Sequence, residues 1–273
     1  MRFRYLCGVE YFERGDRLFP SNCSDCVVVH NNWIVSREAK VYRFKEHLMW
    51  HYDKEAYYTN LAQGYLTYAN PVIWSNESAS VQEELEALRA ALAYGALLNR
   101  VVILPRFHCL PAVTKAKPKR DKKGGPVTQA TPPQLPDREC PLNSILNITA
   151  FDAMFVDRYR ESSFLLHPLV SDEVKRDLSV PYLVSTGPTA DLWGQLNFTV
   201  DSADVHIVTS LAGASAKALT ADDVQQSLLM DKKRVLRFHS LYRATPEFKN
   251  MREQEAFNAK VKAAFQQSTY RQL

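Results

Sequence analysis

The stretch that decides the fold runs from Tyr65-Leu66-Thr67-Tyr68 through residues 81–98 to Val101-Val102-Ile103-Leu104. The first segment alternates like a strand. In the second, Ser80 and Glu83 form a capping box, and apolar residues then recur at helical spacing. The third is a β-branched run, which is typical of a fully buried strand. A strand, a crossover helix and a second strand make a right-handed βαβ unit, so the sequence predicts an α/β fold with parallel strands.

The same kind of pattern continues toward the C-terminus. Short strands are expected at 182–184, 205–208 and 235–238, and helices at 222–230 and 247–267. The last helix is predicted from an apolar stripe of Phe248, Met251, Phe257, Val261, Ala264 and Phe265. We therefore expect a Rossmann-like α/β domain over residues 61–273, interrupted by a mobile Pro- and Lys-rich loop at 110–139.

Residues 1–60 form a separate zone that is dense in aromatic and charged residues. Residues 25–30 predict a short buried strand, while 37–50 fits either a helix or an extended arm.

Composition excludes several classes of protein. The chain has 273 residues, of which 46% are apolar and 23% charged, as in ordinary globular proteins. No apolar run approaches the ~18 residues of a membrane helix, and the start has no signal-peptide pattern. The net charge is +4, but residues 115–123 hold six basic residues and one acidic residue, a local +5. A solvated loop explains that run better than a nuclear signal, and no basic face indicates nucleic-acid binding.

The cysteines and glycosylation sequons bear on the compartment. Cys109 and Cys140 bracket the 110–139 loop, and a disulfide between them would close it; the alternative is five free thiols in a cytosolic protein. Four N-x-[ST] sequons begin at Asn22, Asn76, Asn147 and Asn197. This number exceeds the roughly one or two expected by chance and favours a secretory lumen.

Two groups of side chains are candidates for binding chemistry. His30, Asn31 and Asn32 follow a buried strand, where an imidazole suits a divalent metal and carboxamides suit hydroxyl or phosphate oxygens; a simple turn is the alternative. Lys40, Arg43 and Lys45 come close behind and suit a diphosphate or a solvated basic face.

A third acidic group is expected to be structural. Asp152, Asp157 and Glu161 are predicted to lie on an exposed helix face rather than to form a catalytic pair.

The first sixty residues resemble a known family. Tyr11-Phe12, Phe19-Pro20, Val28-Val29-His30-Asn31-Asn32-Trp33-Ile34-Val35, Ala39-Lys40-Val41-Tyr42-Arg43-Phe44-Lys45-Glu46 and Trp50 resemble the closing segment of the nucleotide-diphospho-sugar transferase domain, found in plant cell-wall arabinosyl- and xylosyltransferases and their animal and algal relatives. Leu98-Asn99-Arg100-Val101-Val102-Ile103-Leu104-Pro105, Cys109 and Cys140-Pro141-Leu142 resemble the C-terminal extension of some members.

The resemblance implies a fold and an activity. Residues 1–60 would be the C-terminal piece of a GT-A type domain, and 61–273 its extension. The activity would be sugar transfer from a nucleotide-diphosphate sugar to a glycan or glycoprotein acceptor, with a divalent metal, manganese, as cofactor. His30 would be a metal ligand, Asn31 and Asn32 would lie near donor or acceptor hydroxyls, and Lys40 and Arg43 near the diphosphate.

The sequence also departs from the family pattern. Ser36 stands where the family has Gly, and no D-x-D precedes His30. We therefore expect this chain to be the C-terminal part of a longer Golgi-lumen enzyme whose N-terminal anchor is missing here. The alternative function is a non-catalytic luminal module that binds a glycan or a partner enzyme. A basic cytosolic or nuclear protein is the third possibility.

Overall fold

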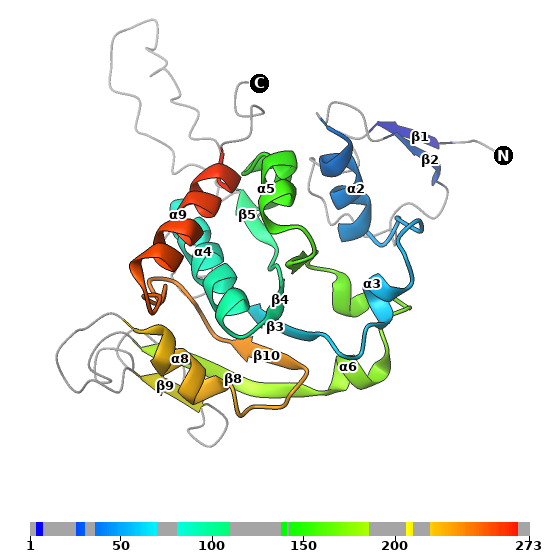
Figure 1. Cartoon of the computed structure of the whole chain (residues 1–273). Coiled ribbons are helices and arrows are strands. Elements are labelled where there is room, and N and C mark those ends of the chain that lie inside the picture. The colour runs from blue at the N-terminus through cyan, green and yellow to red at the C-terminus, as the bar shows by residue number, and fades with distance from the viewer. Residues whose placement is uncertain are drawn as a thin grey trace, which may run out of the picture.

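The computed structural model describes residues 4–7, 26–30, 36–69, 81–109, 138–140, 142–185, 206–209 and 219–266. It confirms the predicted α/β class. A single sheet of six parallel strands forms the centre of the molecule (Figure 1). The strand order is β7 (Tyr159–Arg160), β4 (Arg100–Ile103), β3 (Gly64–Tyr68), β10 (Val235–Phe238), β8 (Leu178–Ser185) and β9 (His206–Thr209).

The predicted βαβ unit is present. Strand β3 leads through α4 (Val81–Leu97) to β4, and β3 and β4 pair in parallel from Gly64↔Arg100 to Thr67↔Ile103. The strands predicted near 182–184, 205–208 and 235–238 are also confirmed. The β-branched side chains of β4 point alternately to both faces, with Val102 in one core and Val101 and Ile103 in the other, which explains why this run is apolar throughout.

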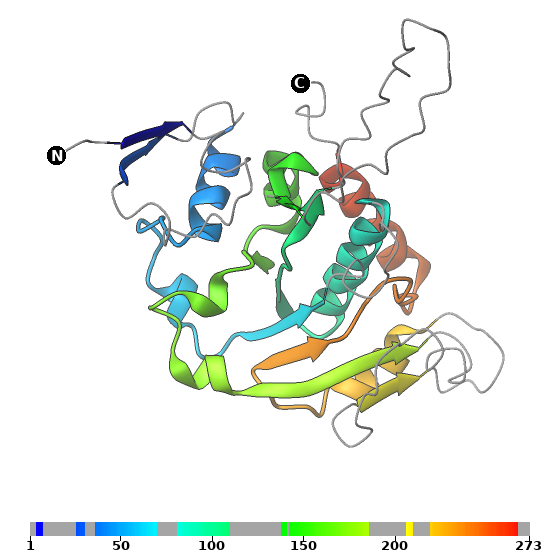
Figure 2. The ribbon, with the colours of Figure 1, turned by 180° about the vertical axis from the view of Figure 1, so that it is seen from behind.

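The helices cover the two faces of the sheet unequally. One face carries α4, α5 (Ile148–Phe155), α8 (Ala221–Leu228) and α9 (Met251–Ala264), whose side chains share the larger core (Figures 1 and 2). The other face carries α3 (Ala56–Thr59), a 3₁₀ turn at Phe164–Leu166 and α6 (Asp172–Arg176) over a smaller core. Right-handed crossovers explain this division. From β3 through β4 to β7 the chain moves toward one edge of the sheet, and from β7 to β8 it moves back toward the other edge, so the connecting helices lie on opposite faces.

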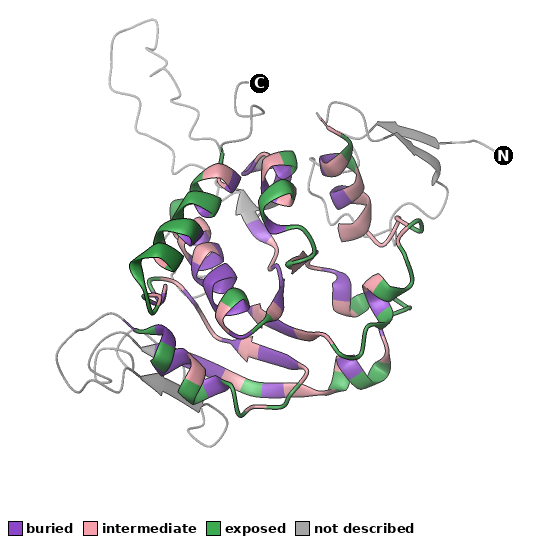
Figure 3. Cartoon of the chain, in the orientation of Figure 1, coloured by how far each residue is buried: buried purple, intermediate pink, exposed green. Residues whose placement is uncertain are grey.

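Burial follows the predicted stripe on the last helix only in part. Phe257, Val261 and Ala264 of α9 are buried, as predicted, while the outer face of the helix is exposed (Figure 3). Met251 is 77% exposed, because it is the first residue of the helix and lies outside the stripe that faces the core.

Residues 37–46 form a helix rather than an extended arm. Helix α2 (Arg37–Glu46) begins after Ser36, whose side chain accepts a hydrogen bond from Ala39 N at 3.2 Å. Ala39 and Tyr42 enter the larger core, and α2 packs against α5. Residues on both sides of position 60 therefore share the core of the sheet.

Two short pairs of strands complete the described structure. Strand β1 (Arg4–Cys7) pairs in parallel with β2 (Cys26–His30), and β5 (Phe107–Cys109) pairs antiparallel with β6 (Arg138–Cys140). A 3₁₀ turn at Leu142–Ser144 follows β6. Among the described residues, no helix has the length and apolar character needed to cross a membrane.

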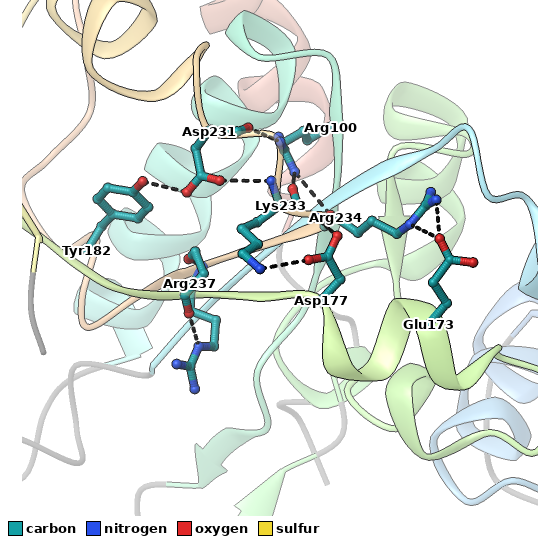
Figure 4. A network of polar contacts seen from close by, with 9 residues as sticks. Arg100, Glu173, Asp177, Tyr182, Asp231, Lys233, Arg234 and Arg237 are labelled. Atoms are coloured by element: carbon teal, nitrogen blue, oxygen red, sulfur yellow. Dashed lines mark hydrogen bonds and ion pairs between the residues drawn. The ribbon is translucent and has the colours of Figure 1, made fainter.

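The amino ends of the central strands are fastened by Arg100, the first residue of β4. Its Nη1 donates to the carbonyl oxygens of Tyr65, Lys233 and Arg234 at 3.2, 2.8 and 3.0 Å, and its Nη2 donates to that of Asp231 at 3.0 Å (Figure 4). One side chain thus joins β3, β4 and the loop that leads into β10.

Candidate functional site

The edge of the sheet formed by β4 and β7 offers a place for a site. After β4 the chain continues to α5 on one face, and after β7 it continues to α6 on the other. Neighbouring strands whose connections leave on opposite faces mark the usual ligand position of open α/β sheets. Arg106 lies shortly after β4. Arg160 is the last residue of β7, and Glu161 follows it.

A buried cluster of charges surrounds Glu161, which is 1% exposed. The Tyr57 hydroxyl donates to Glu161 Oε2 at 2.7 Å. The Arg160 guanidinium and the Lys45 ammonium each lie 3.9 Å from the centre of the Tyr57 ring. Within the described part of the chain, neither Glu161 Oε1 nor Arg160 Nε has a hydrogen-bond partner.

The cluster extends toward α3. Lys45 Nζ pairs with Asp53 Oδ1 at 2.9 Å, and Tyr58 donates to Asp53 Oδ2 at 2.8 Å. The Tyr58 ring stacks on His167, with the ring centroids 3.8 Å apart. The Ser163 hydroxyl donates to the Lys45 carbonyl at 2.8 Å. Helix α2 and the residues after β7 therefore form one polar cluster.

Burial changes the acidity of two carboxyls in this region. It raises the pKa of Glu161 above its usual range, against the hydrogen bond from Tyr57 and the charge of Lys45. It also raises the pKa of Glu46, the last residue of α2, to about 8, although the charges of Arg43 and Arg106 oppose the rise. A carboxyl whose pKa lies near neutral pH is suited to give and take protons.

The predicted donor-binding residues lie in different surroundings in the structure. Lys40 is exposed on α2. Arg43, one turn further, is 1% exposed, and its Nε donates to Asn143 Oδ1 at 2.9 Å. His30 ends β2 in register with Cys7, but its side chain lies outside what the structure describes, as do Asn31 and Asn32. The structure therefore does not bring the predicted set together, and the roles of these residues stay predictions.

One predicted glycosylation site lies in the described residues. Asn147 caps α5, accepting from Ala150 N at 3.3 Å, and the Thr149 hydroxyl of the same sequon donates to Glu38 at 3.0 Å. Asn22, Asn76 and Asn197 lie outside the described residues.

The predicted disulfide falls on the β5–β6 hairpin. The hairpin brings together the strands that carry Cys109 and Cys140, but it pairs Cys109 with Arg138 and Cys140 with Phe107. The cysteines are thus diagonal neighbours, and a bridge would require the register to shift, because diagonal positions are about 7–8 Å apart. The disulfide stays a prediction.

Sequence reasoning missed the centre of the cluster. The prediction of an exposed helix face is wrong for Glu161, which is buried after a strand of two residues. Asp152 does lie on a helix, where its carboxylate accepts from the Tyr159 hydroxyl at 2.9 Å. A two-residue strand is too short to show any periodicity, so only the dense charge and aromatic content of Tyr159-Arg160-Glu161 offered a signal.

A metal centre is not formed by the described part of the chain. There, no three His, Cys, Asp or Glu side chains gather as ligands of one ion. Since His30 is described only by its backbone, this finding does not bear on its predicted role.

Comparison with known proteins gives no relative: no family model, curated protein or solved structure matches this chain.

Proposed function

We propose that the chain is the C-terminal part of a glycosyltransferase that moves a sugar from a nucleotide-diphosphate donor to a glycan or glycoprotein acceptor. Residues 1–60 would complete a GT-A type donor domain, with residues 36–60 also packing on the sheet of the Rossmann-like extension formed by residues 61–273. The resemblance of residues 11–50 to nucleotide-diphospho-sugar transferases is the starting point of this proposal.

One observation carries the proposal. Helix α2, which holds Lys40, Arg43 and Lys45, packs on α5, and its Lys45 carbonyl accepts a hydrogen bond from Ser163, three residues after β7. The end of α2 that carries Lys45 therefore lies near the carboxyl end of β7, on the side of the sheet where α/β proteins bind ligands. Cations there would stabilise the negative charge that a leaving nucleoside diphosphate gains.

Glu46 supplies the acid–base chemistry in this proposal. The acceptor hydroxyl gives its proton to the Glu46 carboxylate while its oxygen forms a bond to the anomeric carbon. The bond from that carbon to the phosphate oxygen breaks, and the nucleoside diphosphate leaves with the electron pair. A half-buried carboxyl with a pKa of about 8 is mostly protonated at neutral pH, so this step uses its ionised fraction, and sugar transfer should become faster as the pH rises toward 8.

The metal and the compartment belong to the same proposal. A divalent ion such as manganese would neutralise the diphosphate, with His30 among its ligands. A Golgi lumen fits the sequons, and the cap at Asn147 is compatible with a glycan, because capping uses Oδ1 whereas the glycan is attached to Nδ2.

Sugar transfer by protein purified from its native cells tests the proposal. The protein is incubated with Mn²⁺, a panel of nucleotide-diphosphate sugars and glycoprotein acceptors, and released nucleoside diphosphate is measured. We expect release from one donor and its loss in His30→Ala. His51→Ala, a change at an exposed histidine, is the matched control and should retain activity.

Two results would contradict the proposal. If no donor yields nucleoside diphosphate, the chain is not a transferase, and retained glycan binding would favour the non-catalytic module. Full release by His30→Ala would exclude the metal role assigned to that residue.

A further inference from the structure

A groove of about 850 Å³ lies between α4, α9 and the loop that joins β10 to α9. The two helices lie side by side in both ribbon views (Figures 1 and 2). Helix α4 follows β3, and the loop follows β10, which is the neighbour of β3 in the sheet. The groove is therefore built from the connections that leave the carboxyl ends of two central strands, and its volume is that of a site for a small ligand.

The α4 wall of the groove carries a partly satisfied arginine. Gln82, Leu85, Glu86 and Arg89 line it from one face of the helix. Arg89 Nη2 donates to Asn258 Oδ1 of α9 at 2.7 Å, which fixes the guanidinium between the helices. Its Nε is buried and has no hydrogen-bond partner in the described structure. A buried donor on a charged group is costly to leave unmet, so this position favours an anionic oxygen.

The opposite wall adds positive charge and apolar surface. Arg243 is exposed, and its guanidinium lies 4.9 Å from the centre of the Tyr242 ring. Asn250 caps the amino end of α9, accepting from Glu253 N at 2.8 Å, and lines the groove. Helix amino ends carry partial positive charge. Phe248 is half-buried and packs on Phe257 with ring centroids 5.0 Å apart.

The charges of the lining define the ligand further. Three cationic side chains (Arg89, Arg243 and Lys249) and two anionic ones (Glu86 and Glu247) line the groove. Lys249 is already paired with Asp222 at 2.7 Å. Without Lys249, the two arginines and the two glutamates of the lining balance each other. A ligand is therefore held by a local ion pair at one arginine, which suits a single carboxylate better than the two charges of a phosphate monoester. Gln82, Glu86 and Thr245 offer further polar groups that can bind hydroxyls.

We infer that this groove binds an acidic sugar residue, with its carboxylate at Arg89 and its ring face against Phe248. The site is distinct from the Glu46–Glu161 cluster. The role of the groove, to hold an acidic residue of the acceptor away from its reacting hydroxyl, rests on the proposed function, whereas the binding of an acidic sugar does not.

Titration of the whole chain with methyl β-D-glucuronoside, followed by NMR, tests the inference. Methyl β-D-glucoside is the neutral control, and glucose 6-phosphate tests a dianion. We expect the glucuronoside to perturb resonances of groove residues and to bind about tenfold or more tightly than the glucoside. Arg89→Gln should remove this preference, while Arg252→Gln, on the exposed face of α9, should keep it.

Each other outcome overturns the inference. Equal binding of glucuronoside and glucoside would show that no carboxylate is recognised, and tighter binding of the phosphate would assign a different anion. Absence of binding at tens of millimolar, or an unchanged preference in folded Arg89→Gln, would remove the site. Because the titration contains no nucleotide sugar, it fails or succeeds independently of donor turnover.

Discussion

Replacement of Arg100 by alanine should destabilise the sheet domain by about 3 kcal/mol. Two guanidinium nitrogens of Arg100 serve four carbonyl oxygens at the amino ends of β3 and β10. Hydrogen bonds from a charged donor contribute about 1.5–3 kcal/mol each. The pKa of Arg100 is lowered because its charge is partly removed from water. In the variant, water can hydrogen-bond to some of the carbonyl oxygens that Arg100 leaves. We therefore count the loss of two hydrogen bonds rather than four, at the lower end of that range.

Conservative variants separate charge from geometry. Arg100→Lys keeps the charge but presents a single nitrogen, so it should recover about half of the loss. Arg158→Ala is the matched control: Arg158 is exposed and donates from Nη1 to Asn99 Oδ1 at 2.9 Å, and its removal should cost less than about 1 kcal/mol.

Urea unfolding followed by circular dichroism measures these effects. The midpoint should fall for Arg100→Ala, with an unchanged dependence of the free energy on urea concentration. If Arg100→Ala and Arg158→Ala lose the same free energy, the carbonyl contacts do not hold the strand ends together. If Arg100→Lys equals wild type, charge alone explains the effect.

Two further variants test the site and the packing. Glu46 has a folded pKa of about 8 against an ordinary 4.5, so the wild type should lose stability, about 4 kcal/mol, as pH rises through that window. Glu46→Gln should flatten this loss in urea unfolding from pH 5 to 8.5, and exposed Glu255→Gln should not. In Gly95→Ala the new Cβ would lie 2.9 Å from Arg100 O and Val102 Cγ2, and overpacking of about 1–3 kcal/mol should outweigh a helix gain of about 1 kcal/mol. A thermal melt higher than that of wild type would refute this argument.

The sheet could be predicted because its strands carry their own signal. The runs at 101–104 and 235–238 are rich in residues that fit a buried strand, and the chain between 65 and 104 shows the change from strand to helix to strand. Strand β7 carries no such signal, since its two residues join the sheet only through β4. The register, the strand order and the reversal at β7 depend on long-range pairing.

The candidate site was harder to predict for the same reason. Tyr57 and Glu161 are 104 positions apart, and Arg43 and Asn143 are 100 apart, yet each pair shares a hydrogen bond. Sequence patterns singled out Arg43 and Lys45 as basic, but they cannot show which cation is buried and which carboxyl it meets. Glu161 was predicted to be exposed because charged residues usually lie at the surface, whereas here it is buried and held by hydrogen bonds and nearby charges.

Residues 36–60 contact the sheet domain so closely that activity has to be measured on a chain that contains both segments. Tyr57 supplies the hydroxyl that Glu161 accepts, and Tyr58 stacks on Phe164, with ring centroids 6.0 Å apart. The Lys45 carbonyl accepts from Ser163. A fragment that began at residue 61 would leave the Glu161 carboxyl without its donor and expose the smaller core on one side of the sheet. The acidity of the cluster is therefore a property of the two segments together, and loss of activity in such a fragment would report a damaged sheet edge rather than a missing donor domain.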